Sequence, residues 1–361
     1  MTDYPATIDD AVVLITGGTG SLGQTLVRRL LEGDLGTPSK IIVFSRDEAK
    51  QYAMKTSWKH AMYATDDISY HNFDDLIEFR IGDVRDPDSV YDAVSRADVV
   101  FHAAAMKQVP ACEYWPAQAV ATNVDGAHHV VQAVRRSGRP HTVLAVSTDK
   151  ACKPINVMGM TKALQERIVI EGNLDAPSQR FIAVRYGNVL SSRGSAIPLF
   201  KKQIAAGGPL TITLPEMTRF LLSLDSAVDT VFAAYRSAER GDIFVPRVRS
   251  ARIVDVAEAM IGEQPIEMVV TGIRPGEKIH EILVSEEEAF RTTERADHYV
   301  VQPQLPELAS SEGSRPLEGD YSSADAVVTG AALLDLIAQA DFVDPAMGGV
   351  RPELAQTDLP R

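Results

Sequence analysis

The sequence contains few cysteines and no long hydrophobic run. Its two cysteines, Cys112 and Cys152, form neither a CxxC pair nor a zinc-binding pattern, which is typical of a protein in a reducing cytoplasm. No apolar run approaches the roughly 18 residues that predict a transmembrane helix. The segment Met1–Asp10 is acidic and polar, unlike a signal peptide. We therefore expect a cytoplasmic protein without a membrane partner.

The sequence also lacks an excess of positive charge. It has 36 Lys+Arg against 49 Asp+Glu, a formal net charge of −13. Nucleic acids and anionic membranes select clustered basic residues, so neither is an expected partner. His128 and His129 have no further ligand at metal-binding spacing, and we predict no metal site. The 361 residues suffice for two domains, or for one large domain with an appendage.

Short apolar runs alternate with helical patterns through the first half of the chain. Strands are predicted at Ala11–Ile15, Lys40–Phe44, Leu76–Ile81, Val99–His102, Val143–Val146 and Phe181–Arg185, and helices at Gln24–Leu31, Asp88–Ser95 and Ala117–Arg136. This alternation predicts an α/β fold with a Rossmann-type, doubly wound parallel sheet. The continuous apolar strands are typical of a sheet covered on both faces.

The pattern changes after residue 190, where we predict a smaller α/β C-terminal substrate-binding domain. Helices are predicted at Ile197–Ala206, Leu224–Arg236, Ile253–Met260 and Glu286–Glu294, and strands at Leu210–Thr213 and Asp242–Pro246. Residues 1–190 and 214–246 are assigned to the cofactor domain, 191–213 and 247–341 to the substrate-binding domain, and 342–361 to a loose tail. The polar segment 56–75 is expected to be a surface excursion.

A glycine-rich segment directly follows the first predicted strand. Gly17, Gly20 and Gly23 form G-x-x-G-x-x-G before a predicted helix, which indicates a dinucleotide diphosphate bound at the helix N-terminus. Further along, Asp83 and Val84 follow the third strand, where the adenine edge is usually bound. The small side chains of 103–105 allow close approach to the ribose. The predicted cofactor residues here are Gly17, Thr19, Gly20, Ser21, Leu22, Gly23, Asp83, Val84, Ala103, Ala104 and Ala105.

The end of the second strand favours NADP over NAD. An NAD-binding protein usually carries an acidic residue there for the ribose 2′-hydroxyl. This chain has Ser45 and Arg46 at that place, followed by Asp47 and then Lys50. A guanidinium and a hydroxyl suit a 2′-phosphate, which a carboxylate would repel. We predict NADP, with Asp47 as the one residue against it.

Several longer motifs then identify a family. They are TGGTGSLG, FSRDEAKQ, GDVRD, HAAAMKQVP, STDKACKPIN, RYGNVLSSRGS, MTRF and IRPGEK. Over roughly residues 10–305 the chain resembles the extended short-chain dehydrogenase/reductases and, among them, the UDP-N-acetylglucosamine 4,6-dehydratases. The resemblance implies a homo-oligomer, a dimer or larger. It also implies that Lys162, Tyr186 and Asn188 contact the cofactor.

The resemblance implies catalytic roles for Thr148, Asp149 and Lys150. The superfamily pairs a catalytic tyrosine with a lysine; Lys162 matches the lysine, but Met158 occupies the tyrosine position and cannot accept a proton. The implied reaction oxidises C4 of the sugar, eliminates water across C5 and C6, and returns the hydride to C6. In it Lys150 removes the C5 proton and Asp149 protonates the departing hydroxyl. NADP is regenerated in each turnover, which favours tight binding.

Two further expectations concern proton transfer. Lys150 must be neutral to act as a base, so we predict that burial or a nearby cation lowers its pKa. With methionine at position 158, we predict that a water relayed by Asp149 or Thr148 deprotonates the C4 hydroxyl. Inversion at C5 is favoured over retention. Two competing hypotheses are a 4-epimerase and a non-catalytic NADP-binding regulator.

A second set of residues is predicted to hold the substrate, UDP-N-acetylglucosamine. Arginines from distant segments suit a diphosphate because each guanidinium is bidentate to phosphate oxygens. A glutamate suits a sugar hydroxyl, and an asparagine at the carboxyl end of a strand lies where open α/β sheets bind ligands. The predicted residues are Lys107, Asn188, Val189, Arg193, Ser195, Arg219, Arg274 and Glu277.

Overall fold

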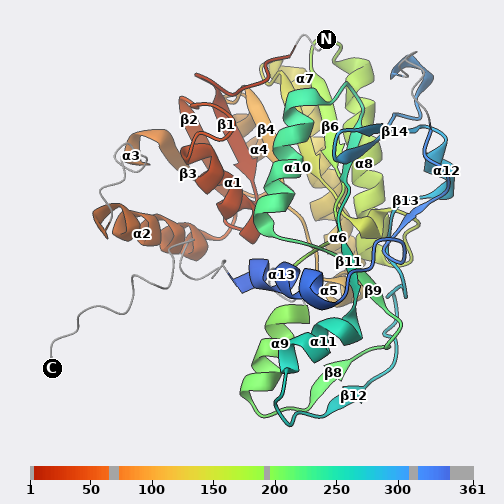
Figure 1. The fold of residues 1–361 in the computed structure, drawn as a ribbon. Coiled ribbons are helices and arrows are strands. Elements are labelled where there is room, and N and C mark those ends of the chain that lie inside the picture. The colour runs from red at the N-terminus through yellow and green to blue at the C-terminus, as the bar shows by residue number, and fades with distance from the viewer. Residues whose placement is uncertain (1–3, 65–72, 191–195, 309–315, 342–361) are drawn as a thin grey trace, which may run out of the picture.

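A nine-stranded sheet forms the centre of the computed structural model (Figure 1). The structure describes residues 4–64, 73–190, 196–308 and 316–341. In the sheet the strand order is β14-β15-β10-β6-β5-β4-β1-β2-β3. The strands from β10 to β3 are parallel, and β15 and β14 continue the sheet antiparallel at one edge. The predicted Rossmann-type parallel sheet is confirmed.

The elements of the large sheet and its covering helices come mainly from the first 246 residues. The strands are β1 (Val12–Thr16), β2 (Lys40–Ser45), β3 (Ile77–Ile81), β4 (Val99–His102), β5 (Thr142–Val146), β6 (Arg180–Val184), β10 (Ile243–Pro246), β14 (Thr292–Arg295) and β15 (His298–Val301). The helices are α1 (Ser21–Leu31), α2 (Glu48–Ala64), α3 (Phe73–Leu76), α4 (Pro87–Val94), α5 (Val109–Tyr114), α6 (Pro116–Ala119), α7 (Gly126–Ser137), α8 (Val157–Asp175) and α10 (Leu224–Ser237).

The remaining elements surround one end of the sheet. They are the strands β7 (Asn188–Val189), β8 (Leu210–Ile212), β9 (Thr218–Leu222), β11 (Ser250–Arg252), β12 (Met268–Val270), β13 (Ile282–Val284) and β16 (Tyr321–Ser322), and the helices α9 (Ala196–Ala205), α11 (Ile253–Ile261), α12 (Glu286–Ala289) and α13 (Gly330–Asp341). α9, α11, β8 and β12 lie below the sheet in Figure 1. They share an apolar core with α13 that is separate from the cores on the sheet.

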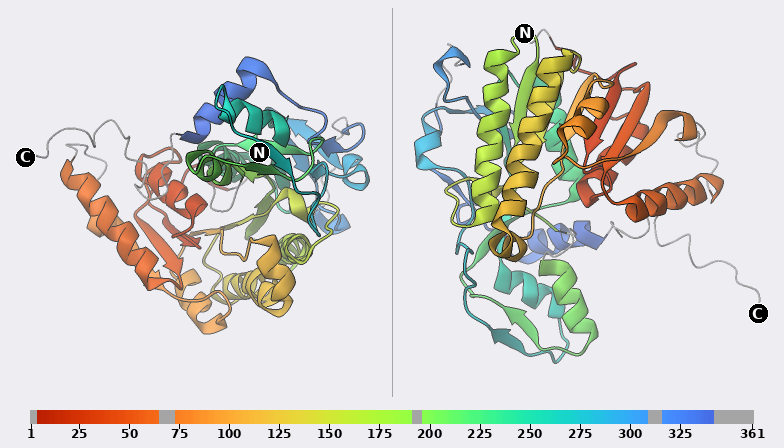
Figure 2. Two further views of the ribbon diagram at one scale, coloured as in Figure 1. Left: turned by 90° about the horizontal axis from the view of Figure 1, so that it is seen from below. Right: turned by 180° about the vertical axis from the view of Figure 1, so that it is seen from behind.

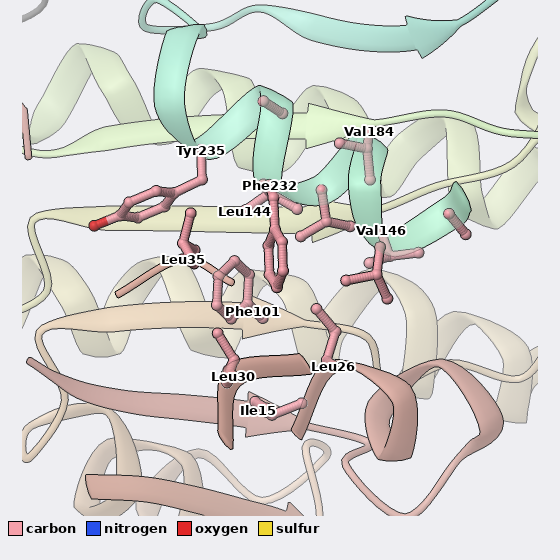
Figure 3. Close-up of a cluster of buried hydrophobic side chains, with 14 of the residues drawn as sticks. Ile15, Leu26, Leu30, Leu35, Phe101, Leu144, Val146, Val184, Phe232 and Tyr235 are labelled. Carbon is pink, nitrogen blue, oxygen red and sulfur yellow. The ribbon is translucent and has the colours of Figure 1, made fainter. Parts of the chain in front are cut away.

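Helices cover both faces of the sheet because its strands carry apolar side chains on both sides. In β1, Ile15 points into the core under α1 and α10, whereas Leu14 belongs to the core on the opposite face. Figure 3 shows the first core, where Phe101 of β4 meets Tyr235 of α10 at a ring-centroid distance of 6.2 Å. Seen from behind, α7 and α8 run side by side over the other face (Figure 2, right). Each large buried apolar side chain contributes about 1.5–3 kcal/mol of transfer free energy.

Strand positions in the first half were predicted to within one residue, but other predictions were wrong. The predicted helix Ala117–Arg136 is interrupted by a π-helical turn, Val120–Asp125. The predicted helix Glu286–Glu294 ends at Ala289, because residues 292–295 pair with β15 as a strand. The sheet therefore includes residues 292–301, which the predicted division assigned to the smaller domain.

The prediction that residues 56–75 form a surface excursion was also wrong for the first residues of this segment. α2 extends to Ala64, and Trp58 of this helix is buried in the core under α1. The predicted tail, residues 342–361, lies outside the described residues. Among the described helices, none combines the length and the hydropathy of a membrane span.

Candidate active site

The glycine-rich loop lies between β1 and α1, where the strand order of the sheet diverges to β2 on one side and β4 on the other. Gly17 has φ +69°, and a Cβ there would lie 2.8 Å from the backbone of Ala104. A glycine is therefore required for this close crossing. The N-cap of α1 is Gly20, which has no side chain to cap the helix, so amides of the first turn face the loop. This arrangement fits a dinucleotide diphosphate.

A cleft of about 770 Å³ opens beside this loop. Every predicted site residue that the structure describes lines it. From the cofactor prediction these are Gly17, Thr19, Gly20, Ser21, Leu22, Gly23, Ser45, Arg46, Asp47, Lys50, Asp83, Val84, Ala103, Ala104, Ala105, Lys162, Tyr186 and Asn188, and from the others Lys107, Thr148, Asp149, Lys150, Met158, Val189, Arg219, Arg274 and Glu277. Arg193 and Ser195 lie outside the described residues.

The end of β2 presents an exposed guanidinium to the cleft. Lys50 pairs with Asp47 at 2.6 Å, and that hydrogen bond lowers the pKa of Asp47. Arg46 is exposed and, among the described residues, forms no salt bridge. Asp83 accepts hydrogen bonds from Arg85, which lower the pKa of its carboxyl group. Arg46 is therefore a charge at this end of the cleft that is available to a phosphate.

The segment predicted to be catalytic is a short 3₁₀ turn, Asp149–Ala151, directly after β5. Thr148 caps this turn, and its hydroxyl donates a hydrogen bond to Oδ1 of Asp149 at 2.7 Å. Lys150 Nζ donates to the same oxygen at 3.1 Å. Asp149 is fully buried, and its Oδ2 has no hydrogen-bond partner in the described part of the chain. A buried carboxylate oxygen without a partner has unused capacity to accept a proton or a ligand hydroxyl.

A second buried carboxylate faces Lys150, and the sequence motifs did not reveal it. Oε1 of Glu281 lies 3.3 Å from Lys150 Nζ and 3.9 Å from Nε of Arg219. Burial lowers the pKa of Lys150, but the charges of Asp149 and Glu281 outweigh it and raise that pKa above its usual value. The predicted lowering of the Lys150 pKa was therefore wrong. The one feature of the sequence that could have indicated this second carboxylate is the position of Glu281, three residues after the IRPGEK motif.

The start of α8 packs directly against the Asp149–Ala151 turn. A Cβ on Gly159 would lie 2.1 Å from the carbonyl oxygen of Lys150, so only glycine fits this contact. Met158 beside it is buried and offers no proton acceptor. Lys162 Nζ donates to the carbonyl of Val146 and to Gln165, and burial lowers the pKa of Lys162 to about 8.

The residues predicted to hold a substrate come from β7, β9 and the segment before β13. Arg219 donates to the carbonyls of Thr218 and Ile279, while Arg274 is exposed. Oδ1 of Asn188 is buried and has no partner among the described residues. A smaller cleft of about 200 Å³ continues from here, between α9 and α11, and its lining combines apolar side chains such as Phe200 with polar ones such as Arg219 and Glu277. Charged and apolar surfaces thus adjoin at this end.

The other candidate groups have structural partners. Burial raises the pKa of Cys152 to about 12, which leaves its thiol protonated. His129 contacts the carbonyl of Val84 through Nδ1. Within the described ranges, no three His, Cys, Asp or Glu side chains gather as a metal site.

The parallel sheet and the glycine loop after β1 define a Rossmann-type α/β protein. The chain belongs to the polysaccharide biosynthesis protein family, which it matches over residues 13–303. The prediction from its motifs is thereby confirmed at the level of the family.

Relatives with different names are similarly close. A UDP-N-acetylglucosamine 4,6-dehydratase (inverting) of Campylobacter jejuni is 39% identical over 81% of this chain and 83% of that protein. A UDP-glucose 4-epimerase of Rickettsia massiliae is 43% identical over 80% and 82%, respectively. A protein of Methanocaldococcus jannaschii described as an uncharacterized membrane protein is 41% identical over 81% and 86%.

Solved structures agree on the fold. Pen from Bacillus thuringiensis has a TM-score of 0.80 and 31% identity, covering 92% of this chain and 98% of that one. DesIV, a dTDP-glucose 4,6-dehydratase from Streptomyces venezuelae solved with NAD bound, has a TM-score of 0.63 at 19% identity over 74% and 86%.

Proposed function

We propose that this chain is an NADP-dependent UDP-N-acetylglucosamine 4,6-dehydratase that inverts C5 and forms a UDP-2-acetamido-2,6-dideoxy-4-hexulose. The observation that carries the proposal is the cluster of Thr148, Asp149 and Lys150 in the cleft, beside a methionine at the tyrosine position. An elimination of water needs an acid and a base on neighbouring carbons, and this cluster supplies both. The inverting relatives from Campylobacter jejuni support the same substrate and stereochemistry.

Gly17 and Arg46 would help to hold a nicotinamide cofactor, which would supply the hydride acceptor for C4 and the hydride donor for C6. Asp149 receives the C4 hydroxyl proton through the Thr148 hydroxyl, with which it shares a 2.7 Å hydrogen bond. The oxidised C4 makes the C5 proton acidic, and Lys150 removes it as a neutral amine. Asp149 then protonates the C6 hydroxyl, which leaves as water. Because the cofactor would be regenerated in each turnover, it would not have to dissociate, and tight binding would not slow the reaction.

Different parts of UDP-N-acetylglucosamine would lie in the larger and in the smaller cleft. Arg219 and Arg274 would hold the diphosphate, and the unpartnered Oδ1 of Asn188 would accept a hydrogen bond from a ligand N–H or hydroxyl group. The carboxylate of Glu277 would accept a hydrogen bond from a hydroxyl group of the ribose or of the sugar. The smaller cleft, where Phe200 lies among both apolar and polar side chains, would receive the base. Homo-oligomeric assembly and a cytoplasmic location stay predictions.

A 4-epimerase is the second candidate, because the Rickettsia relatives carry that name. An epimerase moves a hydride and one hydroxyl proton at C4, and needs no base for C5. It normally relies on the tyrosine that Met158 replaces here. Lys150 beside Asp149 would have no catalytic role in epimerisation, so the dehydratase is favoured over the epimerase. A non-catalytic regulator would have no use for either residue.

The experiment is incubation of the purified chain with UDP-N-acetylglucosamine and NADP, followed by mass spectrometry. Loss of one water from the nucleotide sugar is the expected result. An isomer of unchanged mass would favour the epimerase, and unchanged substrate would contradict both. Proton NMR of the product made in deuterated water separates inversion from retention at C5.

Arg46→Ala is expected to weaken NADP binding and leave NAD binding nearly unchanged. Loss of a hydrogen bond between a cation and a phosphate removes about 1.5–3 kcal/mol, which is about 10- to 100-fold in Kd. Calorimetric titration with each cofactor measures both constants. Arg252→Ala, a change on the exposed pair with Asp255, is the control. Equal affinities of Arg46→Ala and the unaltered protein for NADP would contradict the NADP proposal.

A further inference from the structure

Lys150 lies between two buried carboxylates that come from different parts of the fold. Asp149 is its neighbour in the 3₁₀ turn, and Glu281 reaches it from the segment before β13. Each carboxylate has one oxygen near Lys150 Nζ, and each has a second oxygen that is buried without a partner among the described residues. The arrangement has the capacity for two further protons or ligand hydroxyls.

Glu281 is held firmly in this position. Its backbone N–H donates to Oγ of Ser323 at 2.9 Å, and the backbone N–H of Ser323 donates to its carbonyl at 2.8 Å. The side chain of Glu281 is 3% exposed and lines the cleft. These two hydrogen bonds hold the backbone at Glu281 against a neighbouring segment, so the position of its side chain is defined more closely than on an exposed loop.

The charges around Lys150 keep it an ammonium group in the resting protein. The groups that face it are Asp149, Glu281 and the guanidinium of Arg219, and the two carboxylates outweigh the guanidinium. An ammonium group has no lone pair and cannot remove a proton from C5. In the proposed mechanism Asp149 already takes the proton of the C4 hydroxyl and gives it to the C6 hydroxyl. The proton of Lys150 therefore needs another acceptor.

We infer that Glu281 is the proton partner of Lys150, a positioning residue that takes one proton from its ammonium group before elimination. The inference rests on the proposed dehydratase function. An N–H bond of Lys150 breaks, its electron pair stays on Nζ, and the proton binds a carboxylate oxygen of Glu281. Nζ then takes the C5 proton, and the C5–H electrons form the C5–C6 double bond as water leaves. When C5 is reprotonated from Nζ, the proton on Glu281 returns to Lys150.

Glu281→Gln tests this step because the amide keeps the shape of the side chain and cannot take up the proton. At pH 7 the rate of water loss is expected to fall about 100-fold. The variant should then recover about tenfold per pH unit, because Lys150 must lose its proton to solvent instead, and the recovery should end at the Lys150 pKa, which loss of the Glu281 charge lowers. Glu281→Asp keeps a carboxylate and should restore part of the neutral-pH rate. Glu286→Gln, an exposed change on α12, is the matched control.

A second measurement needs no turnover. Trace acetylation of Lys150 with acetic anhydride, followed across pH by mass spectrometry, reports the pKa of its amine. Removing one facing anion should lower that pKa by about one unit or more in Glu281→Gln, whereas Glu286→Gln should not change it. An unshifted labelling curve, or an activity loss that is equal at every pH, would overturn the inference. Failure of the proposed function is seen separately, as the absence of water loss in the unaltered protein.

Discussion

Lys150→Arg is expected to stop the loss of water and leave C4 oxidation measurable. The guanidinium keeps the positive charge between Asp149 and Glu281, so neither buried carboxylate loses its counter-charge. It does not give up a proton at neutral pH, and the base for C5 is therefore missing. We expect water loss to fall about 10²- to 10⁴-fold, the contribution of a general base. Mass spectrometry of the product and nicotinamide absorbance in a single turnover measure the two steps.

Lys153→Arg is the matched control for this prediction. It makes the same chemical change one turn away, at a residue that faces Glu286 and Glu287 rather than the cleft. It should leave both steps at their original rates. Exchange of the C5 proton with deuterated water gives an independent readout, and we expect none in Lys150→Arg. Water loss by that variant at the original rate would show that Lys150 is not the base.

Asp149→Asn is expected to block the reaction earlier, at C4 oxidation. The amide has nearly the shape of the carboxylate and keeps an oxygen for the Thr148 hydroxyl, but it cannot hold the C4 proton. We expect reduced nicotinamide to form about 10²- to 10⁴-fold more slowly in a single turnover. A rate equal to that of the unaltered protein would exclude Asp149 from C4 deprotonation.

Asp88→Asn, an exposed change in the first turn of α4, serves as its control and should keep the original rate. Thr148→Val tests the relay, because it removes the hydroxyl and keeps the branched shape. A loss in Thr148→Val close to that of Asp149→Asn would indicate that the proton passes through the hydroxyl. Thermal unfolding of both variants shows whether the buried turn remains folded.

Local sequence patterns were sufficient for the parallel core of the fold. β1, β4 and β5 are apolar on both sides because helices cover both faces, so they stand out as continuous runs between polar segments. The helix Glu286–Glu294 was mispredicted because its charged residues suit a helix, whereas the sheet hydrogen bonds to β15 depend on tertiary pairing. Trp58 was misplaced for a similar reason, since its burial depends on the core beneath α1.

The sequence alone located the glycine loop, the Asp149–Ala151 turn and the residues predicted to face phosphate groups, because these predictions depend on residue types at short spacing. The tertiary structure decided which of these groups share a cleft. It placed Glu281 against Lys150 and thereby reversed the expected direction of the lysine pKa. Charge interactions depend on distance through space, and only the folded chain brings the segment at β13 against the turn that follows β5. The scarce cysteines and the absent hydrophobic span were visible at once, but the protonation of the site was not.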